Sequence, residues 1–259
     1  HEARSSKIYG VECGNVTVNM AAVREYLRDR INHVYEHEKP SILEAAGVSM
    51  YSGAARFLSP HSIAVGEQTL HGKHFVLCTG ATARTPPVTG LQDVPFHTHA
   101  TIFDNDRLPN HLIVLGAGPI GVELAQAYGR LGAQVTLCGP TLLAGEEPEV
   151  APVIEACLLE DNVHWVNQYV AKVQGAANDF QATLQDGRTI QGDMLLVAAG
   201  RAPNIHGLGL EHADVRADNE AIATDDRLRT SAPHIFAAGD CTGGPQFTHF
   251  AGWQGFLAA

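Results

Sequence analysis

Four short runs of consecutive apolar residues divide the chain, at positions 75–78, 112–115, 194–199 and 235–238. A run of this length without polar alternation predicts a strand that is buried on both faces, as in a parallel sheet. A glycine follows each run within two residues. The pattern therefore predicts an α/β fold built around parallel strands that end in glycine turns.

Helical and antiparallel patterns fill the rest of the chain. Asn19 is a good N-cap, and apolar residues then recur at helical spacing to about His37. A second short helix is expected from Pro40 to about Gly47. Strand-like pieces at 48–51, 55–58, 62–65 and 69–70 predict a small antiparallel meander. The pattern also predicts helices at 149–160 and from 248, and strands at 163–166, 170–173, 180–184 and 189–190.

Two shorter signals complete this outline. Asp186-Gly187 separates two of the predicted strands and is a hairpin signal. Residues 81–110 contain four prolines and are interpreted as a connection between domains.

The stretch from His111 to Gly139 carries the clearest chemistry. Its apolar run is followed by a G-x-G-x-x-G sequence, a helical pattern ending at Gly132, and a second strand over 134–138. In such a unit the glycines allow a tight turn, approach of the backbone to a pyrophosphate, and close packing of helix on strand. The helix N-terminus adds N–H groups and a positive dipole end. The stretch predicts dinucleotide binding by Gly116, Gly118, Pro119, Ile120 and Gly121.

Composition and charge narrow the class of protein. The 259 residues are 45% hydrophobic and 17% charged, and the net charge is −11. This charge argues against nucleic acid or an anionic membrane as a partner, and no apolar run approaches the roughly 20 residues of a membrane span. The five cysteines form no close pair, which favours a reducing, cytoplasmic compartment. Cys78 and Cys138 fall in apolar runs and are expected to be buried.

The motifs together resemble a known family. LCTGATARTPPVTG (77–90), the G-x-G-x-x-G unit with Glu123, LLVAAGRAPN (195–204) and IFAAGDCTGGPQFTHFA (235–251) occur in one order. This set resembles the flavoprotein pyridine nucleotide-disulfide oxidoreductases, which include dihydrolipoamide dehydrogenase, glutathione reductase and mercuric reductase. The stretches at 135–150 and 241–255 are most similar to the mercuric reductase branch.

The resemblance implies a fold of two nested doubly wound, Rossmann-like domains in three layers. An FAD-binding domain would comprise residues 1–106 and 205–259, and an NAD(P)-binding domain at 107–204 would be inserted into it. The family's first FAD strand with its own glycine motif, its C-x-x-x-x-C pair and its C-terminal dimerisation domain have no counterpart in the sequence. We therefore expect a central portion of a homodimeric parent protein, inactive in isolation, with the FAD domain incomplete.

The resemblance also implies roles for single residues. Asp240 would bond the flavin ribityl chain beside Gly239, and Thr79 and Gly80 would lie against FAD. Phe247 and Thr248 would begin the helix that faces the flavin pyrimidine end. Gly53 and Ala55 match a contact near the adenine, Glu123 an acid beside the nicotinamide, and Pro119 the place of an aromatic gate. Gly139 and Gly200, which follow two of the apolar strands, are assigned to cofactor binding as well.

The implied activity is an FAD- and NAD(P)H-dependent oxidoreductase that passes electrons to a cysteine pair and then to a small disulfide or a metal ion. No residue of the sequence is assigned as catalytic or as a metal ligand. A dihydrolipoamide dehydrogenase-like enzyme, a thiol-independent flavin oxidase and a binding module without turnover stay open as alternatives. NADPH is slightly favoured over NADH, because the first acid after the second strand is Glu146.

Overall fold

The computed structural model describes residues 2–218 and 220–259 and contains two compact units. Unit 1 comprises the residues up to Tyr35 together with Ala83–Gly200, and unit 2 comprises Glu36–Thr82 together with Arg201–Ala259. The boundaries expected from the sequence lie at 106/107 and 204/205. The first compact unit thus includes residues 83–106, which precede the expected NAD(P)-binding segment, and excludes its last residues, 201–204.

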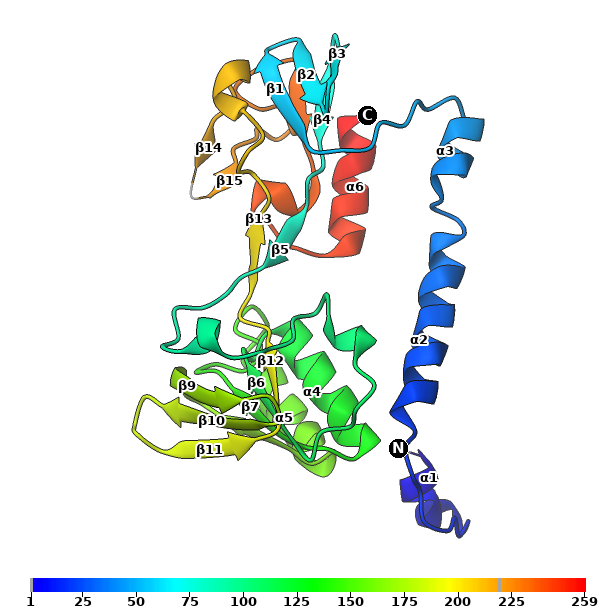
Figure 1. Ribbon diagram of the computed structural model, residues 1–259, viewed down its shortest axis with the longest axis vertical. Helices are drawn as coiled ribbons and strands as arrows, with labels where there is room; N and C mark the ends of the chain where they lie inside the picture. Colours follow the sequence, from blue (N-terminus) through cyan, green and yellow to red (C-terminus); the bar gives the residue numbers. More distant parts are fainter. Residues whose placement is uncertain (1, 219) are drawn as a thin grey trace. The chain divides into compact units, whose positions relative to one another are not determined.

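A four-stranded parallel sheet forms the centre of unit 1, in the order β12-β6-β7-β8. Figure 1 labels β12, β6 and β7 of this sheet. Its strands are β6 (His111–Leu115), β7 (Gln134–Cys138), β8 (Val163–Val166) and β12 (Met194–Val197). An antiparallel sheet adds β9 (Val170–Ala176), β10 (Asp179–Leu184) and β11 (Thr189–Gly192). The expected hairpin at Asp186-Gly187 is confirmed, because Thr183 pairs with Thr189 across it.

Both faces of the parallel sheet are buried, as its apolar runs predict. Leu112 and Val114 pack on one face against helices α4 (Pro119–Leu131) and α5 (Val150–Glu160). Ile113 and Leu115 point to the other face and pack against β9 and β10. Unit 1 therefore has three layers, helix, parallel sheet and antiparallel sheet, and the predicted α/β class is confirmed.

Helix α4 is closed at its C-terminus by two devices. Gly132 adopts a left-handed conformation with φ of +116°, which favours glycine. Arg4, in α1 (Glu2–Ser5), donates hydrogen bonds of 2.8 Å to the carbonyl oxygens of Arg130 and Leu131. A cation is favourable at the end of a helix whose last carbonyls have no partner within the helix.

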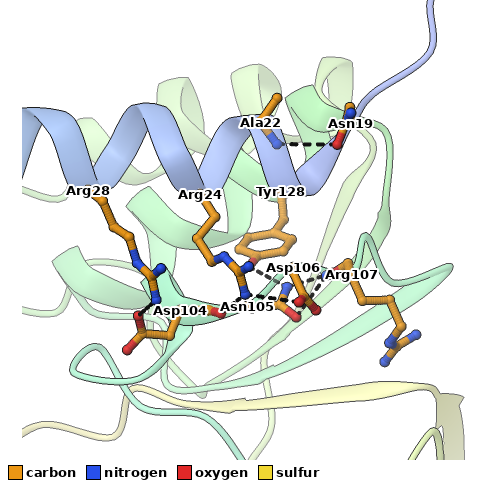
Figure 2. Close-up of polar contacts among 9 residues, drawn as sticks. All are labelled: Asn19, Ala22, Arg24, Arg28, Asp104, Asn105, Asp106, Arg107 and Tyr128. Atoms are coloured by element: carbon orange, nitrogen blue, oxygen red, sulfur yellow. Dashed lines mark hydrogen bonds and ion pairs between the residues drawn. The ribbon is translucent and has the colours of Figure 1, made fainter.

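Helix α2 (Met20–Tyr35) is attached to unit 1 through its first half. Met20 is buried in the core, and the carbonyl oxygen of the Asn19 side chain accepts a hydrogen bond from Ala22 N, which confirms the predicted N-cap. Figure 2 shows Arg24 and Arg28 extending from this helix toward the segment 104–106. Arg24 Nη1 lies 2.9 Å from Asp106 Oδ2, and Arg28 Nη2 lies 3.2 Å from Asp104 Oδ1.

The connection at 83–110 is part of the unit 1 core rather than a free linker. Leu91, Val94 and Ile102 are buried, and the segment includes η2 (Leu91–Asp93) and η3 (Ile102–Asp104). Asn105 donates to the hydroxyl of Tyr128 on α4 at 3.0 Å, also drawn in Figure 2. The connection is rich in proline, but its apolar side chains pack in the same hydrophobic clusters as the residues of the parallel sheet.

Unit 2 contains four small groups of paired strands and several short helices. A meander of β1 (Ala55–Ser59), β2 (Ser62–Val65) and β3 (Gln68–His71) is antiparallel, as expected. β4 (Phe75–Leu77) pairs in parallel with β16 (Ile235–Ala237). β5 (Ala81–Ala83) pairs with β13 (Arg201–Pro203), and β14 (Ala217–Asp218) forms a hairpin with β15 (Ala221–Ile222). The helices of unit 2 are α3 (Pro40–Ala45), η4 (Leu210–Ala213), η5 (Gly239–Thr242) and α6 (Thr248–Ala258). A further short helix, η1 (Ser6–Tyr9), belongs to unit 1.

Two expectations about unit 2 are wrong. The predicted strand at 48–51 is an exposed segment without strand pairing, because its apolar residues contact no sheet in the described chain. The run at 75–78 is a strand, but only one of its faces is covered. Phe75 and Leu77 pack on the unit 2 core, whereas Val76 and Cys78 point the other way and are exposed. Within residues 2–218 and 220–259, no helix has the length and apolar character needed to cross a membrane.

Candidate dinucleotide sites

The glycine turn of unit 1 is shaped by two close contacts. Gly116 ends β6 with φ of +117°, and a β-carbon there would stand 2.2 Å from the carbonyl oxygen of Ala198. A β-carbon on Gly121 would stand 1.9 Å from the carbonyl oxygen of Gly116. Gly118, the N-cap of α4, differs, because a β-carbon on it would meet no atom within 4 Å. Gly116 and Gly121 are therefore required by packing, and Gly118 leaves its space open for a ligand.

The carboxyl ends of three adjacent strands meet at this turn. Gly116 follows β6, Gly139 follows β7 and Gly200 lies three residues beyond β12. Gly139 is held against Ala117, and its carbonyl oxygen accepts a hydrogen bond of 2.8 Å from the indole of Trp165. In the order β12-β6-β7-β8 the chain passes from β6 to β7 and β8 on one side and returns to β12 on the other side of β6, and ligands of open α/β sheets bind at such a point.

The first turn of α4 carries the other predicted residues of unit 1. Pro119 occupies the first helical position, where its missing N–H costs nothing. Ile120 packs partly on the core, and Glu123 is exposed. The first-turn amides of a helix have no partner within the helix and favour an anion. The turn thus suits the pyrophosphate of a dinucleotide, and Glu123 is free to reach a ligand beyond it.

The predicted flavin residues of unit 2 also gather at the ends of paired parallel strands. Thr79 and Gly80 follow β4, and Gly239 and Asp240 follow β16. Gly239 has φ of +79°, and its N–H donates to the side chain of the buried Gln254 at 2.7 Å. The structure therefore brings together two segments that are 160 residues apart in the sequence, which supports their assignment to one site.

A partly buried ion pair joins these two segments. Arg201 Nη1 lies 2.5 Å from Asp240 Oδ2, and the side chains are 23% and 12% exposed. Arg201 Nη2 donates to the carbonyl oxygen of Ala81 at 3.1 Å. Arg201 Nε is buried and has no hydrogen-bond partner among the described residues. A buried N–H without a partner is costly, so this atom marks a polar environment beside Asp240 that the described residues do not complete.

Asn204 makes a second connection within unit 2. Its side chain donates to the carbonyl oxygen of Thr79 at 2.9 Å, and its own carbonyl oxygen accepts from the Thr79 hydroxyl at 2.7 Å. Its backbone N–H donates to the carbonyl oxygen of Gly80. Thr79 and Gly80 are thus held by residues that immediately follow unit 1 in the sequence.

Four other predicted residues lie apart from this cluster. Phe247 is the N-cap of α6 and Thr248 its first residue, which confirms the predicted start of that helix, and both are exposed. Gly53 and Ala55 lie at the start of β1, where they neighbour Val65 of β2. The hydrogen bonds and ion pairs of the described residues do not connect Gly53 or Ala55 to Asp240 or Thr79. Their role at an adenine stays a prediction.

The cysteines are five free thiols. Cys13, Cys78 and Cys157 are exposed, and Cys138 and Cys241 are buried. Burial raises the pKa of the Cys138 thiol to about 12. Partial burial, followed by the nearby Cys241, also raises the pKa of Cys78. In the part of the chain that the structure describes, no group of three or more His, Cys, Asp or Glu side chains is arranged to hold a metal ion.

Sequence reasoning missed Arg201, Asn204 and Gln254. The first two lie in the stretch GRAPN, where a charged residue directly follows the glycine that ends a buried strand. That position was a usable signal, because a charge at the carboxyl end of a parallel strand faces the edge where ligands bind. Gln254 gives no such signal, since a lone glutamine in an apolar helix carries no pattern.

Two α/β units, each with glycines at the carboxyl ends of adjacent parallel strands, define the class of proteins with two nested dinucleotide-binding folds. The chain belongs to the pyridine nucleotide-disulphide oxidoreductase family, which it matches over residues 7–255. It is 33% identical over 259 residues to the mercuric reductase of Acidithiobacillus ferrooxidans, covering 96% of this chain and 47% of that protein. A mercuric reductase of Streptomyces lividans is 37% identical over 201 residues, covering 75% of this chain and 42% of the relative.

Solved structures agree with this family. The HOCl-induced flavoprotein disulfide reductase RclA of Escherichia coli superposes with a TM-score of 0.84 at 27% identity, covering 92% of this chain and 56% of RclA. LpdA of Mycobacterium tuberculosis gives a TM-score of 0.83 at 27% identity, covering 99% of this chain and 58% of LpdA. The chain spans about half the length of the curated relatives it matches. The predicted family and fold class are thereby confirmed.

Proposed function

We propose that the protein is an oxidoreductase that uses NAD(P)H bound in unit 1 and FAD bound in unit 2. The observation that carries this proposal is the pair of strand-end clusters, Gly116–Gly121 in one unit and Thr79–Gly80 with Asp240 in the other. Family membership supports the same cofactors. When bound, the two cofactors supply hydride transfer and electron storage, and the protein supplies binding and orientation.

Each cluster has a feature that fits its cofactor. Gly118 presents open space and the first turn of α4 presents unpaired amides, a combination that suits a pyrophosphate. In unit 2, Asp240 offers carboxylate oxygens to a polyhydroxyl chain. Glu123, exposed on α4, is proposed to lie beside the nicotinamide.

The proposed acceptor is a small disulfide or a metal ion, reached through a cysteine pair. The mercuric reductase relatives and a Cu(II) complex of RclA, which covers 93% of this chain, support a metal-ion acceptor. The five described cysteines lie at least 19 residues apart, so we do not assign the pair among them. The homodimer and the cytoplasmic location stay predictions from the sequence.

Anaerobic reduction of the flavin tests this function. The full-length protein is expected to retain FAD through gel filtration, and NADPH or NADH is expected to bleach its visible absorbance. A Gly118→Asp variant should retain FAD but resist reduction by either coenzyme, because only the unit 1 site is blocked. Purified protein that binds no FAD, or flavin that NAD(P)H does not reduce, would contradict the proposal.

A further inference from the structure

We infer that Arg201 is a positioning residue of the flavin site, which acts by holding the carboxylate of Asp240. This inference rests on the proposed function, because it assigns Asp240 to the flavin. Arg201 itself need not contact the cofactor. It would fix the direction of the Asp240 side chain and join it to the chain segment that follows Thr79 and Gly80.

The geometry gives Arg201 two anchors. Its Nη1 lies 2.5 Å from Asp240 Oδ2, and its Nη2 lies 3.1 Å from the carbonyl oxygen of Ala81. One guanidinium thus bridges η5, which carries Asp240, and β5, which begins one residue after Gly80. The planar fork of arginine can reach two acceptors at once, which the single ammonium group of lysine does less well.

The surroundings make this pair stronger than an ordinary surface ion pair. The Asp240 side chain is 12% exposed and that of Arg201 is 23% exposed, so solvent screens the pair weakly. Breaking a buried pair leaves a charge without a partner, which is strongly unfavourable. The other ion pairs of unit 2 are more exposed. Arg229 and Asp225, for example, are each 44% exposed at 2.8 Å.

The pairing prepares Asp240 for a ligand in two ways. Because Arg201 holds Oδ2, the carboxylate cannot rotate freely, and less conformational entropy is lost when a hydroxyl of the ligand binds. The guanidinium also offsets the negative charge of Asp240, which would otherwise repel a cofactor that carries a pyrophosphate. Asn204, which directly follows β13, holds Thr79 and Gly80, so residues 201–204 organise both strand-end segments.

A double-mutant cycle on FAD binding tests the inference in the full-length protein. FAD is removed, and its dissociation constant is measured by flavin fluorescence for Arg201→Gln, Asp240→Asn and the double variant. Each single change is expected to weaken FAD by about tenfold to hundredfold, the range for a lost hydrogen bond to a charged group. Because Arg201 acts through Asp240, the double variant should match Asp240→Asn within about threefold.

Two further variants serve as a conservative rescue and as a control. Arg201→Lys keeps the charge and should recover a large part of the affinity lost in Arg201→Gln. Arg229→Gln removes the exposed ion pair in the same unit and should leave FAD binding unchanged. If Arg201→Gln does not fold, the same cycle is run with Arg201→Lys, whose smaller loss should likewise vanish in the Asp240→Asn background.

Three outcomes would overturn the inference. Losses that multiply in the double variant would show that Arg201 acts independently of Asp240. Unchanged affinity in Arg201→Gln would show that the pair has no role in binding. Tighter FAD binding would show that Arg201 competes with the flavin for the carboxylate. A wild-type protein that binds no FAD would instead reject the proposed function itself, and the inference with it.

Discussion

Gly121 lies so close to the carbonyl oxygen of Gly116 that a β-carbon on Gly121 would stand 1.9 Å from it. The contact fixes the start of α4 against the end of β6. Neither partner is the end of a flexible side chain, so the backbone would have to move to admit even a methyl group. Gly121 is therefore a packing requirement as well as part of a nucleotide-binding motif.

We predict that Gly121→Ala destabilises unit 1 by about 1–3 kcal/mol, the range for overpacking in a core. Chemical denaturation followed by circular dichroism measures the change. Gly255→Ala is the matched control, because Gly255 also lies in a helix but a β-carbon there meets nothing within 4 Å. That control should be neutral or slightly stabilising, since alanine is the better helix former. Equal stability of Gly121→Ala and wild type would contradict the packing argument.

Substitution of Gly118 should change ligand binding rather than stability, unlike substitution of Gly121. Its β-carbon would face open space, its φ of −80° is allowed for any residue, and it is the N-cap of α4. Aspartate is a favoured N-cap, so Gly118→Asp should leave stability unchanged or raise it by a few tenths of a kcal/mol. The new carboxylate would occupy the space of a pyrophosphate and repel it. NADPH binding, measured by calorimetry, should fall by more than about tenfold. Intact binding would show that the dinucleotide does not lie on this turn.

The contrast between these two glycines shows what the sequence could predict. The G-x-G-x-x-G pattern between strand and helix located the turn, because its glycines, the helix and the flanking strands are encoded by local spacing. The strands at 112–115, 134–138 and 163–166 were located from local pattern in the same way. Which glycine is needed for packing and which leaves space for a ligand depends on how close Ala198 and Gly116 lie in the fold. Only the structure shows those distances.

The pattern of the sequence could not predict which residues far apart in the chain contact one another. Asp240 was predicted from the strand before it, but Arg201 and Asn204 reach its site across the fold and remained unnoticed. Cys78 was expected to be buried because its run is apolar, yet strand alternation places it on the uncovered face with Val76. A run of three or four apolar residues predicts a strand and does not say how many of its faces another layer covers.

Asp193 should contribute to stability in a pH-dependent way. Burial opposes ionisation of its carboxyl, but hydrogen bonds from the N–H groups of His111 and Asn110 and the Arg107 guanidinium outweigh it and lower its pKa. A group with a lowered folded-state pKa stabilises the fold above its unfolded-state pKa of about 3.9, and this contribution is lost as pH falls below that value. Asp193→Asn should therefore cost about 1–3 kcal/mol at pH 7.

Thermal unfolding at several pH values measures this effect. The difference between Asp193→Asn and wild type should shrink as the pH falls below about 4, where the wild-type carboxyl also becomes protonated. Asp186→Asn is the control in the same unit. Asp186 is exposed, and Asn-Gly serves a hairpin turn as well as Asp-Gly does, so little change is expected. A pH-independent loss in Asp193→Asn would contradict the assigned role of the charge.

The choice between NADPH and NADH is predicted from the residues that follow β7. Strands of NAD-specific sites usually end near an acid that binds the ribose 2′-hydroxyl, whereas Gly139-Pro140 follows β7 and the first acid is the exposed Glu146. Arg130 cannot bind a 2′-phosphate there, because it lies in the last turn of α4 and pairs with Asp161 at 2.9 Å. We expect NADPH to bind at least as well as NADH. Equilibrium titration with NADPH and with NADH measures the two affinities. A preference for NADH of about tenfold or more would contradict this expectation.

The five cysteines are predicted to differ in their reactivity. Alkylation requires the thiolate and access of the reagent to it, so exposed thiols react before buried ones. Cys13 and Cys157 should be labelled by iodoacetamide in the native protein, and Cys78 more slowly, because partial burial and Cys241 raise its pKa. Cys138, with a pKa of about 12, and the buried Cys241 should react only after unfolding. Peptide mapping by mass spectrometry distinguishes the five positions.

The same cysteines provide a test of mechanism. Thiol-disulfide chemistry needs one thiol to attack and a second to resolve, and the five thiols of this chain are unpaired. Replacing Cys13, Cys78 and Cys157 together by serine in the full-length protein should therefore leave NADPH-dependent reduction of the acceptor within about twofold of wild type. Retained flavin reduction by NADPH together with loss of acceptor reduction in this variant would show that one of the three exposed thiols belongs to the electron path.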